Sequence, residues 1–259
     1  MSRLRAKCPH RRTLTAVALG AEYECHSCGR DFRAGLVRVP RAWGRGGEEM
    51  AAAARLALPY PEVDVIEEDT LVEQNLALAA SLPERPLVLG GCCCAHVGAV
   101  EGLAARHGRI AVVWLDAHGD LNTPGTSPSG NAWGMPLRML IDSQTVEAGD
   151  ALLVGARNLD PPEQEFIVAS GLGTTEAGLT VALEGTSGVY VALDVDVLDP
   201  AEPAAMFMPE PGGPAIAEIA AFLERTAAAA PVVGAGFTGL RAAPENVAAL
   251  ARFAAALGL

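Results

Sequence analysis

The chain has 259 residues, of which 50% are hydrophobic and 19% are charged, so it is long enough to bury a complete α/β core. Its 31 acidic and 19 basic side chains give a net charge of −12, which disfavours nonspecific binding to nucleic-acid phosphates. No apolar run approaches about 18 uninterrupted residues, and no signal-like stretch follows the basic start, so we expect a cytoplasmic protein without a membrane partner.

Three of the six cysteines fall within the first thirty residues. Cys25 and Cys28 form a Cys-x-x-Cys pair followed by glycine, and a Cys-Pro-His run begins at Cys8. In a chain without a secretion signal this pattern is typical of a zinc ribbon, in which one structural zinc ion has four ligands. The expected ligands are Cys8, His10, Cys25 and Cys28. His26 competes with His10 for the fourth position, and the alternative interpretation is a mobile tail with incidental thiols.

The remainder of the chain alternates short apolar runs with helical patterns, which predicts a mostly parallel sheet covered by helices on both faces. The predicted strands are 35–39, 63–67, 87–90, 110–115, 151–155, 179–182, 189–195 and 232–238. A helix is predicted after the turn at 44–48, ending at Leu58, and further helices at 70–81, 95–107, 162–170, 214–230 and 244–257. We therefore expect a three-layer α/β domain over 34–259, preceded by a zinc-ribbon-like segment over 1–33.

Two acidic runs follow directly on predicted strands. Asp116, His118 and Asp120 alternate along the first run, and Asp194 and Asp196 alternate along the second. Alternation places the side chains of each run on one side of the strand, and open α/β sheets bind ligands at the carboxyl ends of their strands. Four converging carboxylates would repel one another unless cations compensated their charge. The pattern predicts a two-metal site, and the alternative is a solvated acidic turn.

Four sequence blocks resemble, in the same order, those of the ureohydrolase family of arginases, agmatinases and formimidoylglutamases. The blocks are GGCCCAHVG at 90–98, DAHGD at 116–120, VGARNLDPPE at 154–163, and DVDVLDP at 194–200 followed by PEPGG at 209–213. The resemblance covers about residues 35–259 and implies an arginase-like fold. It also implies a binuclear metal-dependent hydrolase that cleaves a carbon–nitrogen bond in a guanidino or amidino small molecule.

The resemblance implies a role for each acidic residue. Asp116 and Asp194 would bridge two divalent ions, Asp120 would complete one site, and His118 with Asp196 would complete the other. Two such ions lower the pKa of a shared water to about 7 and hold it as a nucleophile. Manganese is the usual metal of the family. Asp120 is also the candidate catalytic residue, because a carboxylate bound through one oxygen can transfer a proton through the other.

One ligand position departs from the family pattern, because Cys93 stands where the family has a histidine. A thiolate shifts the metal preference toward zinc or iron and away from manganese. The alternatives are that Cys93 is a small buried hydrophobe, or that the nearby His96 replaces it as a ligand. The expected metal ligands are Cys93, Asp116, His118, Asp120, Asp194 and Asp196.

Two further departures concern catalysis. Trp133 stands where the family has a histidine that acts as an acid; an indole can wall a pocket or stack on a guanidinium, but it cannot transfer protons. Ordinary core packing is the alternative role for Trp133. Gly239 stands where arginases place a glutamate against the guanidinium, so a charged guanidinium would lose its counter-ion here. Unmodified arginine is therefore the weaker candidate substrate.

Several positions that face the substrate in arginases are kept. Asn122, Ser129 and Asn131 match residues that hold the α-carboxylate of an amino acid, and Asp160 matches an acid that meets the α-amino group, although Asn158 replaces another aspartate. These retained positions imply a substrate with an amino-acid head group. Combined with Cys93 and the lost histidine, this pattern resembles the branch of the family that cleaves Nω-hydroxyarginine. Because an N-hydroxyguanidine is less basic than a guanidine, it would depend less on the missing groups.

Other functions remain open at the level of the sequence. The losses at Trp133 and Gly239 also fit a catalytically impaired metal-binding protein with a scaffold or regulatory role. An enzyme of the same mechanism that acts on a formimino or guanidino acid is a third possibility. The family resemblance suggests a homo-oligomer, but no residue pattern fixes its size.

Overall fold

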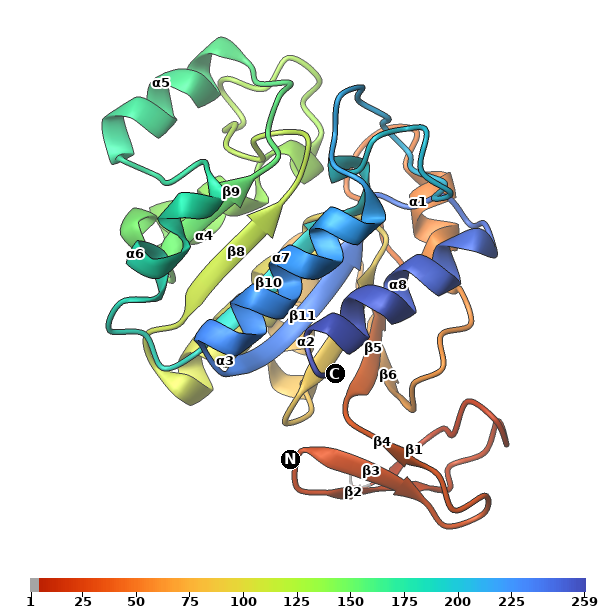
Figure 1. Cartoon of the computed structure of the whole chain (residues 1–259). Helices are drawn as coiled ribbons and strands as arrows, with labels where there is room; N and C mark the ends of the chain where they lie inside the picture. Colours follow the sequence, from red (N-terminus) through yellow and green to blue (C-terminus); the bar gives the residue numbers. More distant parts are fainter. Residues whose placement is uncertain (1–4) are drawn as a thin grey trace.

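The structure is a computed structural model that describes residues 5–259, so the first four residues of the expected ribbon-like segment lie outside the described part. A sheet of seven strands forms the centre of the molecule (Figure 1). All of its neighbouring strands are parallel. In spatial order they are β6 (Glu62–Val65), β5 (Gly35–Val39), β7 (Pro86–Gly90), β11 (Val232–Thr238), β10 (Val189–Asp194), β8 (Ala111–Leu115) and β9 (Ala151–Val154).

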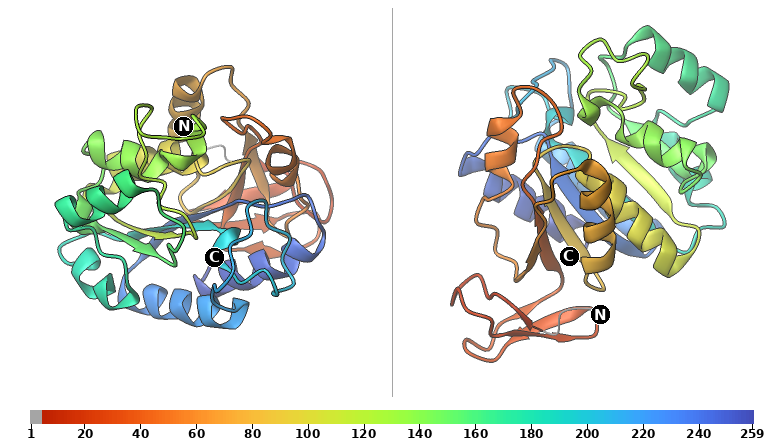
Figure 2. Two further views of the ribbon diagram at one scale, coloured as in Figure 1. Left: turned by 90° about the horizontal axis from the view of Figure 1, so that it is seen from above. Right: turned by 180° about the vertical axis from the view of Figure 1, so that it is seen from behind.

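Helices cover both faces of this sheet, which confirms the predicted three-layer α/β architecture (Figures 1 and 2). They are α1 (Glu48–Ala53), α2 (Leu71–Ser81), α3 (Ala95–His107), α4 (Pro136–Asp142), α5 (Pro161–Ser170), α6 (Leu179–Leu183), α7 (Ile216–Ala229) and α8 (Glu245–Ala256). Short 3-10 turns occupy Ala132–Gly134, Ala148–Asp150, Glu176–Gly178 and Val195–Val197. Within residues 5–259, no helix has both the length and the hydropathy required to cross a bilayer.

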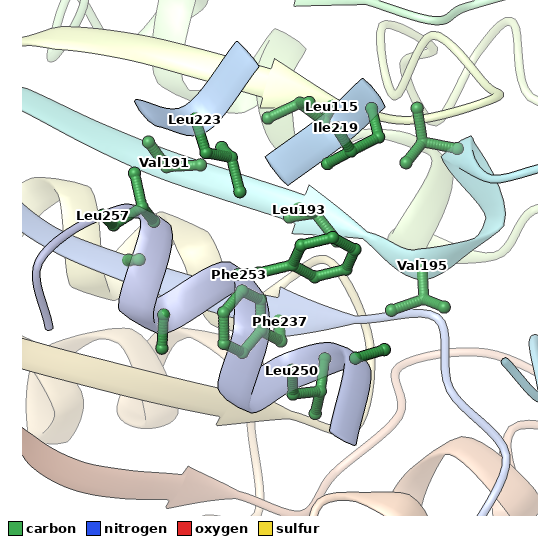
Figure 3. Close-up of a cluster of buried hydrophobic side chains, with 14 of the residues drawn as sticks. Leu115, Val191, Leu193, Val195, Ile219, Leu223, Phe237, Leu250, Phe253 and Leu257 are labelled. Atoms are coloured by element: carbon green, nitrogen blue, oxygen red, sulfur yellow. The ribbon is translucent and has the colours of Figure 1, made fainter. Parts of the chain in front are cut away.

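Alternate residues of each strand enter the two hydrophobic layers. In β7, Leu87 and Leu89 belong to the cluster beneath α7 and α8, whereas Val88 belongs to the cluster beneath α3 and α4. Figure 3 shows the first of these layers, where Phe237 of β11 lies beside Phe253 of α8. Burying a large apolar side chain contributes roughly 1.5–3 kcal/mol, so this double layer makes the carboxyl edge of the sheet a rigid platform.

Three predicted elements differ from the structure. Residues 179–182, predicted as a strand, form helix α6, in which Ala182 is buried and Val181 is 67% exposed. A short segment with β-branched residues forms a strand only where a neighbouring strand can pair with it. Here the packing of residues 179–182 against the rest of the molecule favours a helix over their strand propensity. Strand β6 ends two residues before the predicted boundary, and helix α1 ends at Ala53 instead of Leu58. Helix α4 was not predicted.

The N-terminal segment forms a separate antiparallel sheet of four short strands. These are β1 (Arg5–Ala6), β2 (Ala16–Leu19), β3 (Glu22–Cys25) and β4 (Asp31–Phe32). The segment lies at the amino ends of β5 and β6, below the main sheet in Figure 1. Lys7 and Glu62 exchange two backbone hydrogen bonds of 2.8 and 2.9 Å. The N-terminal sheet is therefore attached to the edge strand at the end of the main sheet opposite to the acidic runs.

Candidate metal centre

Three parallel strands carry the predicted ligands to one edge of the sheet. β8 ends at Leu115, directly before Asp116, and β10 ends at Asp194. β7 ends at Gly90, three residues before Cys93. Because all carboxyl ends of a parallel sheet meet at the same edge, acidic and sulfur side chains from distant parts of the chain converge there.

The potential ligand atoms fall into two groups that share one aspartate. The first group contains Cys93, Asp116 and Asp120, and the second contains Asp116, His118 and Asp196. Within each group the atoms lie within 4.8 Å of one another. Two overlapping groups with a common carboxylate are the geometry that a pair of bridged divalent ions requires.

Asp194 lies beside the first group and is oriented by its neighbours. Its Oδ2 is 3.0 Å from the thiol of Cys93, and its Oδ1 accepts a hydrogen bond of 2.9 Å from the backbone amide of Asp196. The backbone amide of His118 donates to Oδ1 of Asp116 at 2.7 Å. These backbone bonds fix the carboxylates before any ion binds.

Like charges crowd this buried cluster. Burial and the charges of Asp116 and Asp194 raise the pKa of Asp120 well above its usual range, and burial with the same two charges raises the pKa of Asp196. Burial and Asp116 raise the pKa of Asp194 to about 6. Burial lowers the pKa of His118, but the carboxylates of Asp116 and Asp196 raise it to about 12. Divalent cations would relieve this repulsion.

A buried polar atom of Asp120 supports the fit to metal ions. Among the described residues of the cluster, its Oδ2 has no hydrogen-bond partner. His118 directs Nδ1 toward Asp196 at 3.1 Å, while its Nε2 lies 3.6 Å from the carboxylate of Glu210. An imidazole that faces the ion with one nitrogen and a carboxylate with the other has the usual orientation of a metal-binding histidine. The donor set therefore fits divalent metals.

A second layer of polar groups lies behind Cys93 and Asp194. The hydroxyl of Thr238 is 3.3 Å from both the thiol of Cys93 and Oδ2 of Asp194. His96 places Nε2 3.2 Å from this hydroxyl and Nδ1 3.0 Å from the hydroxyl of Tyr190. Burial lowers the pKa of His96 to about 3, so its ring is neutral. With both nitrogens occupied, His96 is placed to orient the ligands from behind.

The loops around the centre are held by one guanidinium. Arg157 donates hydrogen bonds to the backbone carbonyls of Gly155, Asp196, Val197, Leu198, Glu210 and Pro211. Asp120 itself has a φ of 51°, a left-handed conformation that costs on the order of 1–3 kcal/mol for a residue with a side chain. Such strain persists only where the surrounding structure enforces it, and it places the carboxylate of Asp120 toward the shared cavity.

The predicted ligands line a cavity of about 260 Å³. One part of its wall is apolar and contains Met50, Trp133, Phe207 and Met208. Trp133 is only 9% exposed and packs edge-on against Phe207 with ring centroids 6.3 Å apart. The indole therefore packs in a hydrophobic cluster and also forms part of the cavity wall. These are two of the roles that the sequence left open for Trp133.

The predicted substrate-binding residues separate into two sets. Asn122, Ser129 and Asp160 line the cavity, and the side-chain amide of Asn122 donates to Asp160 at 2.8 Å. Asn131 is not among the lining residues, because its side-chain oxygen accepts a hydrogen bond of 2.9 Å from the backbone amide of Arg45. Its position suits it to shape the loop at the mouth of the cavity.

The structure leaves no room for a side chain at Gly239, which accounts for the absence of a glutamate there. It lies at the cavity wall with a φ of 70°, and a Cβ atom built on it would overlap the carboxylate of Asp194. No side chain fits at this position unless the backbone or Asp194 moves. Residue 239 therefore supplies no side-chain counter-ion for a guanidinium here.

The N-terminal residues predicted as zinc ligands are brought together only in part. The thiols of Cys8, Cys25 and Cys28 lie within 4.8 Å of one another. His10 lies outside this group, and its Nε2 is 3.0 Å from the guanidinium of Arg30.

Sequence reasoning missed several residues of the main site. Glu210, which faces His118 and accepts a hydrogen bond of 2.7 Å from Asn158, belongs to the PEPGG block and could have been found from it. Glu163 accepts backbone hydrogen bonds of 2.9 Å from both Leu121 and Asp160, and its spacing from Asp160 is a capping-box signal. No local sequence pattern predicts that Thr238 and Tyr190 belong to the site.

Comparisons with known proteins agree with this geometry. The family model described as Arginase family matches residues 51–258. The arginase of Staphylococcus aureus (strain MRSA252) is 35% identical over 161 residues, which cover 52% of this chain and 53% of that protein. The chain thus spans about half the length of this relative.

Similarity extends further in the arginase of Bacillus caldovelox, which is 34% identical over 199 residues, covering 64% of this chain and 67% of that protein. The crystal structure of the same arginase superposes with a TM-score of 0.72 at 25% identity, over 86% of this chain and 97% of that one. The homologues in this family are amidinohydrolases. With a matching family model, a matching fold and the ligand groups at the expected strand ends, the chain belongs to the arginase family.

Proposed function

We propose that this protein is a metal-dependent hydrolase that cleaves a guanidino or amidino carbon–nitrogen bond in an amino-acid-like small molecule. One observation carries the proposal: two potential ligand groups share Asp116 in the wall of a cavity that also contains Asn122, Ser129 and Asp160. A buried acidic cluster of this kind without a substrate-sized cavity would argue only for metal storage. The two together argue for a reaction at the metals.

The proposed ligands divide between two ions. Cys93 and Asp120 would hold one, His118 and Asp196 would hold the other, and the carboxylates of Asp116 and Asp194 would serve both. Divalent ions held there would supply an activated water and a polarised amidine carbon. Binding two divalent cations also offsets the repulsion among the four carboxylates. The identity of the metals depends on Cys93, because a thiolate favours zinc or iron over the manganese usual in the family.

The polar wall positions the substrate. Asp160 offers a carboxylate to an α-ammonium group, while Asn122 and Ser129 offer donors to an α-carboxylate. Asp120 would take the proton that the attacking water loses, on the carboxylate oxygen that does not hold an ion, and would pass it to the departing nitrogen. Asp120 would then perform the proton transfer for which Trp133 has no donor and acceptor pair.

The apolar wall favours a weakly basic substrate. Trp133, Phe207 and Met50 offer no counter-charge, and Gly239 leaves no room for one. A fully charged guanidinium would pay a desolvation penalty against this wall, whereas a neutral N-hydroxyguanidine would not. Nω-hydroxyarginine is therefore our preferred substrate over arginine, and formimino or other guanidino acids are the next candidates.

The experiment is a substrate panel on the purified chain, reconstituted separately with manganese, zinc and iron. Arginine, hydroxyarginine, guanidino acids and formimino amino acids are each supplied, and urea, hydroxyurea or formamide is measured. We expect hydroxyarginine to be turned over faster than arginine. Faster cleavage of arginine would remove the preference for a neutral amidine.

Tight metal binding without turnover on any substrate would favour the alternative of a scaffold or regulator. Asp116→Asn serves as the control for contaminating activity, because a host hydrolase would survive that substitution. Turnover that is lost in Asp116→Asn belongs to this chain.

A further inference from the structure

The three N-terminal thiols lie close enough together to bind one metal ion. Cys8 Sγ and Cys28 Sγ lie 3.9 Å apart, and Cys25 Sγ is within 4.8 Å of both. Zinc–sulfur bonds of about 2.3 Å at tetrahedral angles place two sulfur atoms about 3.8 Å apart. All three cysteines are free, so a disulfide does not account for the separation.

The backbone around these cysteines forms two matching turns. In the second turn, the carbonyl of Cys25 accepts hydrogen bonds from the amides of Cys28 and Gly29, at 3.2 and 2.7 Å, and Gly29 has a φ of 64°. In the first turn, the carbonyl of Cys8 accepts a hydrogen bond of 2.7 Å from the amide of Arg12, whose φ is 55°. In both turns the residue four positions after the cysteine is left-handed and closes the loop.

This correspondence identifies which residue replaces a fourth thiol. Cys28 lies three positions after Cys25, and the residue three positions after Cys8 is Arg11. Arg11 is exposed and takes no part in the thiol group. His10 is also exposed, and its ring contacts Arg30 and lies 6.1 Å from Phe32. The three thiols are thus the ligands that the turns present.

The N-terminal sheet also needs a source of stability beyond its own packing. Its four strands contain two or four residues each, and protein units below about 40 residues usually rely on disulfides, metals or association. Tyr23 packs against the main domain at Gly35 and Val63, and Lys7 bridges to Glu62. An ion that tied the two turns together would keep this docking surface in shape.

We propose that Cys8, Cys25 and Cys28 bind one zinc ion through three thiolates, with a fourth ligand that is neither His10 nor another protein thiol. This ion fixes the N-terminal sheet against the amino ends of β5 and β6. It is independent of the metal centre, which lies at the opposite edge of the main sheet. The proposed zinc site goes beyond the proposed hydrolase function, and each proposal can be tested without the other.

Zinc content is measured in full-length chains that all carry Asp116→Asn, so that the main centre is disabled throughout and turnover does not enter. We expect one bound zinc per chain in this background and none after Cys25→Ser is added. Adding His10→Ala or His26→Ala should leave the zinc in place. Retention in the Cys25→Ser chain, or loss in the His10→Ala chain, would overturn the three-thiolate assignment.

A gain-of-ligand variant keeps the test valid if Cys25→Ser does not fold. Arg11→Cys places a thiol at the position that matches Cys28 and should complete a four-thiolate site. We expect slower zinc loss to a chelator and a stronger sulfur-to-cobalt charge-transfer band after cobalt loading. Unchanged zinc retention together with an unchanged cobalt spectrum would mean that the two turns do not face a common ion.

Discussion

The molecule contains two clusters of potential metal ligands that are built in opposite ways. The main centre gathers Cys93, Asp116 and Asp194 from strands far apart in the sequence, and Cys93 and Asp194 alone are separated by 101 residues. The N-terminal cluster uses residues 8 to 28, which two tight turns bring together. The first cluster is rich in oxygen and the second consists of sulfur.

The fold of the main domain positions the acidic cluster, whereas a metal bound to the N-terminal thiols would itself stabilise the fold of the N-terminal sheet. The carboxylates of the main cluster are held by buried strands and backbone amides, so the platform does not need bound ions to keep its shape. The N-terminal thiols lie in or beside turns, between strands too short to supply much stability of their own. Metal removal should therefore abolish function at one end and loosen structure at the other.

The largest expected effect comes from the shared carboxylate. Asp116→Asn removes a charge from both ligand groups, and because metal ions contribute several kcal/mol to such reactions, turnover should fall about a thousandfold or more. Metal uptake at the main centre should fall with it. Circular dichroism should show an unchanged fold, because Asp116 lies outside the hydrophobic layers. Retained activity would show that Asp116 is not the bridging ligand.

The sequence predicted the features that follow from periodicity. Buried runs such as 189–195 and 232–238 identified the parallel strands, and acidic alternation after two of them located the candidate metal centre. Residues 179–182 were misassigned because a short, mainly apolar run is compatible with both a strand and a helix turn. Only the packing of this segment against its neighbours decides between the two.

The second layer of the site could not be read from the sequence. Thr238 meets Cys93 across 145 residues, and His96 meets Tyr190 across 94 residues. Thr238, His96 and Tyr190 are ordinary strand or helix residues in their local context. Their function arises from strand order, since β11 lies between β7 and β10, and no short-range pattern encodes that order.

A smaller effect is expected from this second layer. Thr238→Val keeps the side-chain shape but removes the hydroxyl that contacts Asp194 and Cys93, so metal affinity should fall about 10–100-fold. Thr226→Val is a matched control, because Thr226 is equally buried but bonds only the carbonyl of Phe222 within α7. Equal losses of metal affinity in both variants would indicate a general effect on folding instead of ligand orientation.

The proposed ligand Cys93 should affect metal selectivity more than activity. Cys93→His restores the donor type usual in the family, and we expect the preference for manganese over zinc to rise on the order of tenfold, about 1.4 kcal/mol. Competition between the two ions at fixed total concentration measures the ratio. Cys93→Ser is the control for the loss of sulfur alone. An unchanged ratio in Cys93→His would speak against sulfur coordination.

The smallest expected effect lies at the junction between the two regions. Arg38, which is 7% exposed, pairs with Glu62 at 2.6 Å and also donates to the carbonyls of Ala54 and Leu56. Burial raises the pKa of Glu62, but the hydrogen bond and charge of Arg38, aided by Lys7, bring it below the ordinary value of 4.5. A lowered pKa in the folded state means that the stabilisation is complete above pH 4.5 and is lost as the pH falls through the folded value.

Glu62→Gln should therefore lower the free energy of unfolding by about 1 kcal/mol at pH 7 and by less at pH 4, because acid already removes part of the interaction in the parent chain. Urea unfolding at both pH values measures the difference. Glu67→Gln is the matched control, since Glu67 pairs with Arg55 at 2.6 Å but both side chains are about half exposed, and such surface pairs contribute little.

Hydrogen exchange tests whether the N-terminal sheet and the main sheet are stabilised separately. If the junction transmits stability, the backbone amides of β1 and β2 should exchange faster in Glu62→Gln while those of β8 and β10 stay protected. Equal acceleration in all four strands would mean that the N-terminal sheet and the main sheet unfold as one unit.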